Sequence, residues 1–163
     1  MTQPDSPAET AGSTTTSPGT HADAGGRRGG VRVIAMIMIV AGVVFTVAGV
    51  VAYIAVEQTL SDQKITVSDD ADMFAGHAVN GPFTAYSQAM TIGKHAQDIA
   101  GGKTYAELPQ GDPNRDTVMT ASFLQASLFT SVVAFGVSAM AAVVGLLLIL
   151  LGIALRRLAP RPI

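Results

Sequence analysis

Two long stretches without a charged residue dominate the hydrophobic pattern of the chain. The first runs from Val33 to Val56 and the second from Thr117 to Leu155. As a helix, the 24 residues of the first stretch would extend about 36 Å, against a hydrocarbon core of about 30 Å. The pattern therefore predicts a first membrane-spanning helix over residues 31–60.

The second stretch is too long for a single span, because its 39 residues would form a helix of about 58 Å. Its first half is rich in hydroxyl and amide side chains, whereas residues 139–155 are almost purely aliphatic. The middle has no proline, asparagine or aspartate, so we expect one helix over 113–157 rather than two spans. Asp112 and Pro113 are typical of a helix start. The polar outer half of this helix, residues 113–131, is called the post.

The charges predict the orientation of the two helices. The loop from residue 57 to residue 116 has nine acidic and four basic residues, a net charge of −5. The opposite ends of the apolar stretches are flanked by arginines, namely Arg27, Arg28, Arg32, Arg156, Arg157 and Arg161. Because basic flanks remain in the cytoplasm, we expect a multi-pass protein of the cell membrane with both termini cytoplasmic and residues 57–116 outside.

The expected fold class is an all-α membrane protein, a two-span antiparallel transmembrane helical hairpin. Residues 61–112, called the cap, should form a small, mainly helical extracytoplasmic unit with a helix near 82–100 that ends at a glycine pair. Residues 158–163 would be a short cytoplasmic tail. Residues 1–30 are rich in Ser, Thr, Pro, Gly and Ala, which predicts a disordered cytoplasmic tail. Thr14 to Thr16 lie within it, so phosphorylation of this tail is one hypothesis for regulation.

Composition agrees with a membrane protein and excludes one class of partner. Charged residues are 13% of the chain and mean hydropathy is +0.40, both unusual for a soluble domain. The net charge of −2 provides no basic surface for nucleic acid. With no cysteine, the chain has no disulfide or thiolate metal site, and the cap must be held together by packing.

Small residues recur every seven positions in both apolar stretches. In hydrocarbon, helices are held together by close backbone approach, and small residues usually form the contact. A period of seven also favours a left-handed crossing. We therefore predict that the two helices pack through Ala35, Gly42, Gly49, Ser131, Ser138, Gly145 and Gly152.

Residues 82–100 alternate at helical spacing between a polar face and an apolar face. The polar face contains Thr84, Gln88, Thr91, His95 and Asp98, and we expect it to be solvated. The apolar side needs a cover, and the post is the obvious partner. The expected contact between cap and post comprises Phe83, Tyr86, Met90, Ile92, Met119 and Phe123.

The cap contains the residue types of a two-histidine, one-carboxylate metal site. The candidates are Asp69, Asp72, His77 and His95. The sequence lacks the glycine and distal glutamate of a calcium loop, and His77 and His95 do not share a helical face. A solvated turn is the alternative interpretation of residues 68–72, and no cofactor is expected.

The segments GPFTAYSQA, KTYAELP and DPNRDTVMTASFL resemble small actinobacterial two-span membrane proteins catalogued as "aromatic ring-opening dioxygenase LigA". The resemblance covers roughly residues 31–157 and implies a two-span membrane protein of unassigned role. Our leading hypothesis is an accessory or interaction protein of the cell envelope, with the lipid bilayer and another membrane or envelope protein as partners. A homo-oligomer is a further option. The alternative is a metal-dependent, dioxygenase-like enzyme or a metal-binding protein that uses the Asp/His cluster of the cap.

Overall fold

The computed structural model describes residues 24–158. These residues form the helices α1 (Ala24–Asp62), α2 (Pro82–Ile99) and α3 (Arg115–Leu158) and the short 3₁₀ helix η1 (Tyr105–Glu107). No strand occurs among them, although one isolated antiparallel bridge joins Thr66 to Ala78. The protein is therefore mostly helical, and α1 and α3 are both long and apolar enough to cross a membrane.

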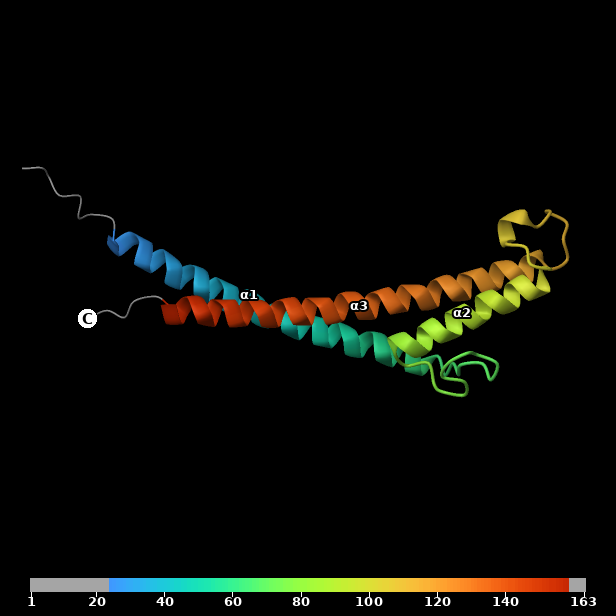
Figure 1. Ribbon diagram of the computed structural model, residues 1–163, viewed down its shortest axis with the longest axis horizontal. Coiled ribbons are helices and arrows are strands. Elements are labelled where there is room, and N and C mark those ends of the chain that lie inside the picture. Colours follow the sequence, from blue (N-terminus) through green and yellow to red (C-terminus); the bar gives the residue numbers. More distant parts are fainter. Residues whose placement is uncertain (1–23, 159–163) are drawn as a thin grey trace, which may run out of the picture.

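The longest helix, α3, is the axis of the molecule (Figure 1). α1 lies along its C-terminal part and α2 along its N-terminal part, so the two shorter helices follow one another along the same neighbour. η1 and the loops around it lie at the end of the molecule opposite the C-terminus.

α1 begins earlier than the sequence predicted. Residues 24–30, which we expected in the disordered tail, are helical. Extending an existing helix by one residue costs much less than starting a new one, so the helix continues back through Gly29 and Gly30 although glycine is a poor helix former. The remainder of the predicted tail, with the three threonines, lies outside the described residues, as does the C-terminal tail beyond residue 158.

α3 is one continuous helix of 44 residues, and it begins two positions later than expected. The Asp112 carboxylate accepts a hydrogen bond of 2.9 Å from the backbone N–H of Asn114, in the turn that leads into the helix. Asp116 lies in the first turn and two arginines in the last, where each charge is favourable for the helix dipole.

Glycines bring the backbones of α1 and α3 into contact. A Cβ atom added to Gly42 would lie 2.6 Å from the carbonyl oxygen of Gly145, and one added to Gly49 would lie 2.6 Å from that of Ser138. A Cβ atom on Gly152 would lie 2.8 Å from the carbonyl oxygen of Ala35. Side chains do not fit at such distances, so this packing requires hydrogen at these positions.

The same contacts fix the antiparallel register of the two helices. Residue 35 faces 152, residue 42 faces 145 and residue 49 faces 138. One further step of seven places Val56 opposite Ser131, and at the other end Arg32 lies level with the arginine pair that follows Leu155. The charge-free residues 33–56 of α1 therefore lie opposite residues 131–154 of α3, and the polar post begins at the level where the stretch of α1 ends.

Two clusters of buried side chains hold the remaining segments on α3. The first lies where α1 ends and α2 begins, and it comprises Leu60, Val67, Val79, Ala85, Ala89, Leu128 and Phe135. The second lies at the far end of α2 and comprises Ala96, Ala100, Leu108 and Val118. Arg115 stabilises this far end, because its guanidinium stacks 4.2 Å from the centre of the Tyr105 ring and donates to the carbonyl of Leu108.

Candidate functional site: an apolar groove between α2 and α3

Local sequence defines both ends of α2. Pro82 occupies the first turn, where its missing N–H is not needed, and the Thr84 hydroxyl accepts a hydrogen bond of 3.2 Å from the N–H of Gly81. At the other end, Gly101 and Gly102 have φ angles of 63° and 83°. The N–H of Gly102 donates to the carbonyl of Gln97 over 2.7 Å, a Schellman ending that favours glycine.

α2 contacts α3 through small side chains rather than through its large ones. The stripe Ala85, Ala89, Gly93, Ala96 and Ala100 faces α3, and its alanines are buried. Phe83 is 74% exposed and Phe123 is 66% exposed, and Met90 is exposed as well. The expected contact therefore differs from the structure at these three positions, because the small stripe allows a close approach that pushes large side chains to its edges.

The other three residues of the predicted contact are partly buried or make a contact on one side. Ile92 packs at the edge of the first buried cluster. Tyr86 is exposed on one side, and its ring lies edge-on to Phe129, with the ring centres 5.9 Å apart. Met119 is half-buried.

The polar face of α2 is solvated only in part: Asp98 is exposed, whereas Gln88 and Thr91 are buried. Gln88 is 8% exposed and Thr91 is 7% exposed, because the loop between α1 and α2 covers them. The side-chain oxygen of Gln88 accepts a hydrogen bond of 2.8 Å from the backbone N–H of Ser68. The Ser87 hydroxyl donates to the carbonyl of Met73 over 2.6 Å. These bonds fix the loop to the helix, and periodicity alone could not reveal them.

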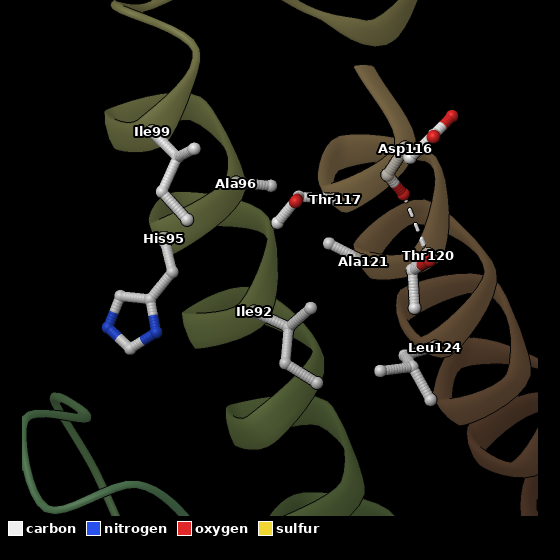
Figure 2. Close-up of a pocket in the computed structure, with 9 residues that line it drawn as sticks. All are labelled: Ile92, His95, Ala96, Ile99, Asp116, Thr117, Thr120, Ala121 and Leu124. Carbon is white, nitrogen blue, oxygen red and sulfur yellow. Dashed lines mark hydrogen bonds between the residues drawn. The ribbon is translucent and has the colours of Figure 1, made fainter. Parts of the chain in front are cut away.

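An open groove of about 470 Å³ lies between the C-terminal half of α2 and the N-terminal part of α3. Figure 2 shows its walls: Ile92 and Ala96 of α2 point towards Ala121 and Leu124 of α3, with Thr117 between them. Ile99, Asp116, Thr120 and His95 complete the rim. An apolar floor with a few polar groups at its edge is suited to binding an apolar side chain or helix face.

His95 joins the groove to the loop. Its ring turns away from α3 (Figure 2), and its Nε2 lies 2.5 Å from Oδ2 of Asp70. The hydrogen bond from the His95 side chain holds the pKa of Asp70 below its ordinary value of 3.8. Both side chains are substantially exposed, so the pair is a surface tether and contributes little to stability.

The predicted metal candidates do not come together. His95 contacts Asp70, which was not among them, and the His77 ring lies beside Phe74 with ring centres 6.2 Å apart. Asp69 and Asp72 lie in the exposed turn before Phe74. Across the described residues, no three histidine or acidic side chains are placed to hold a metal ion.

Six of the seven residues predicted to pack the two long helices are buried where α1 meets α3. Buried positions at the contact are Ala35, Gly42, Gly49, Ser138, Gly145 and Gly152. Ser131 differs, because it is only half-buried and its hydroxyl donates to the carbonyl of Ser127, one turn earlier in α3.

Comparison of the chain with protein families, curated proteins and solved structures found no match. The resemblance described from the sequence therefore stays a prediction.

Proposed function

We propose that this is an integral membrane protein that spans the bilayer twice and serves as an accessory protein of the cell envelope. Its hairpin would place both termini in the cytoplasm and residues 57–116 outside. The observation that carries the proposal is the register of α1 and α3, in which the charge-free stretch of α1, residues 33–56, lies opposite residues 131–154 of α3, the part that follows its polar half. A hydrocarbon slab imposes that coincidence on any pair of helices that cross it.

The exposure of the helices supports the same proposal. Only 17% of the most apolar window in each long helix is buried, so most of these aliphatic side chains point outwards. The core helix of a soluble protein would be covered by other segments. In a bilayer, lipid acyl chains cover these surfaces at no cost.

The position of the basic residues supports the orientation. Arg32, Arg156 and Arg157 lie at one shared end of the two apolar stretches, and Glu57 lies at the other. Because basic flanks are retained in the cytoplasm, this end would face inwards.

The groove supports an interaction role. Ile99 of α2 and Leu124 of α3 line the groove and are exposed, although both lie beyond the level of Ser131, beside the polar half of α3. Apolar groups gathered at this distance from lipid are typical of a protein contact. The proposed occupant of the groove is an apolar helix face of another membrane or envelope protein.

Topology can be tested by thiol labelling, since the chain has no cysteine of its own. Cysteine placed at the exposed Gln110 should react with a membrane-impermeant reagent from outside the cell, and cysteine at Leu158 only after the membrane is opened. Equal labelling of both from one side would contradict the hairpin.

The partner contact can be tested by photo-cross-linking in intact membranes. A cross-linker at position 99 should produce a discrete adduct that Leu124→Glu removes and Gln110→Glu, outside the groove, does not. An adduct of twice the chain mass would identify a second copy as the occupant. Absence of any discrete adduct at position 99 would contradict the interaction role.

A further inference from the structure

The beginning of α2 lies close to the level at which the apolar stretch of α1 ends and the polar half of α3 begins. Tyr53 of α1 contacts Phe135 of α3, with ring centres 4.8 Å apart, and Tyr86 of α2 contacts Phe129 of α3. α2 runs antiparallel to α3, because Gly93 faces Gln125 farther along. Phe83, one turn before Tyr86, therefore lies level with residues 132–133 of α3, just inside the limit marked by Val56 and Ser131.

Phe83 is the most exposed phenylalanine of the described chain at 74%. Met73 and Phe74 are also exposed, and the Ser87 hydroxyl holds the backbone of Met73 against the first half of α2. Tyr86 is also exposed, and its ring lies edge-on to Phe129. No charged residue lies between Met73 and Lys94 in the sequence.

We propose that this surface, Met73, Phe74, Phe83 and Tyr86, rests in the interfacial layer of the outer leaflet as a third membrane contact of the chain. This interfacial contact depends on the function proposed above, in which α1 and α3 span the bilayer. Its occupant is the lipid of the same bilayer, because Phe83 lies level with residues 132–133 of α3, on the membrane side of the limit marked by Val56 and Ser131. Aromatic side chains are favoured at this depth, and tyrosine can keep its hydroxyl in the headgroup layer.

This contact would also fix the height of the groove. Ile92 is nine residues beyond Phe83, which is about 14 Å along a helix. With the first turn of α2 held in the interface, the groove would stand clear of lipid at a set distance from the surface. A partner helix could then reach it only outside the bilayer.

The chain has no tryptophan, so single substitutions report one position each. The variants are Phe83→Trp, Phe123→Trp as a matched exposed phenylalanine on the post, and Phe45→Trp in the middle of α1. Each full-length variant is placed in phosphatidylcholine vesicles, and quenching by brominated lipids is compared with quenching by acrylamide in water.

The fluorescence at position 83 should be blue-shifted and reduced most by lipids brominated near the headgroup. Position 45 should respond most to bromine deep in the acyl chain, and position 123 to acrylamide alone. If brominated lipid quenches position 45 but acrylamide alone quenches position 83, the proposal of an interfacial contact is wrong, whereas the proposed membrane insertion stands. If position 45 is not quenched by lipid, the proposed function itself fails. Lipid quenching at 123 equal to that at 83 would also overturn the inference.

Discussion

α3 has two neighbours, and it packs against them in two different ways. Along α1 the contact is backbone against backbone, with glycines on both helices. Along α2 the contact is made by alanines of α2 and larger residues of α3, such as Val118 and Leu128. Polar bonds from the covering loop to Gln88 and Ser87 complete the outer contact.

This difference follows from the surroundings proposed for the two contacts. In hydrocarbon, apolar side chains gain nothing by leaving lipid, so helices adhere through close approach and van der Waals contact. In water, removing apolar surface from solvent is itself favourable, and buried polar groups need partners. The same helix therefore needs glycine on one half and a mixed surface on the other.

The largest effect should come from Gly145→Ala. The new methyl group would meet the backbone of Thr46 and Gly42, which cannot move aside without separating the helices. We expect a loss of about 1–3 kcal/mol in the free energy of unfolding, measured in mixed micelles by circular dichroism.

Gly136→Ala is the matched control, because a Cβ atom there has no neighbour within 4 Å. It should leave stability unchanged or raise it by up to about 1 kcal/mol through helix propensity. Equal destabilisation by both variants would mean that α1 and α3 do not pack backbone against backbone.

A smaller effect is expected for Gln88→Ala in the outer contact. The variant removes the acceptor of the Ser68 N–H in a largely buried position, which costs about 1–2 kcal/mol. Hydrogen exchange at Ser68 and Val67 should accelerate, whereas Gln97→Ala, at an exposed position of the same helix, should leave it unchanged. Unaltered exchange in the Gln88 variant would show that the loop is held by other contacts.

The smallest effect concerns the tether between Asp70 and His95, which is exposed. Because the folded pKa of Asp70 lies below its ordinary value of 3.8, the stabilisation is fully present above that value and is lost as pH falls through the lowered pKa. The protection factors of the amides within residues 67–76, which correct for the intrinsic pH dependence of exchange, should therefore fall slightly at acid pH. Asp70→Asn should abolish this pH dependence and Asp69→Asn should preserve it. The same dependence in both variants would exclude the tether as its cause.

The elements themselves could be predicted from local sequence. The glycine pair at 101 and 102 marks the end of α2, and the uninterrupted apolar runs indicate both long helices. Local sequence did not predict that α1 begins at residue 24 or that α3 begins at residue 115. The ends of a helix depend on small differences in free energy between helix propagation, capping and turn hydrogen bonds.

The candidate site was less predictable. Periodicity placed Gln88 and Thr91 on a solvated face, and it grouped Phe83 and Phe123 in one contact. The histidines and aspartates appeared in the sequence as a metal cluster, but the turn from Asp69 to Asp72 brings only Asp70 to His95.

The sequence by itself determined which segments are helical, which stretches are long and apolar enough to span a bilayer, and which faces have small residues, because these depend on neighbours a few positions apart. The tertiary structure decided the register of α1 on α3, the exposure of Phe83 and the groove beside Ile92 and Leu124. These depend on how closely two distant backbones approach, and that distance is fixed by the fit of glycine and alanine on one helix against the atoms of another.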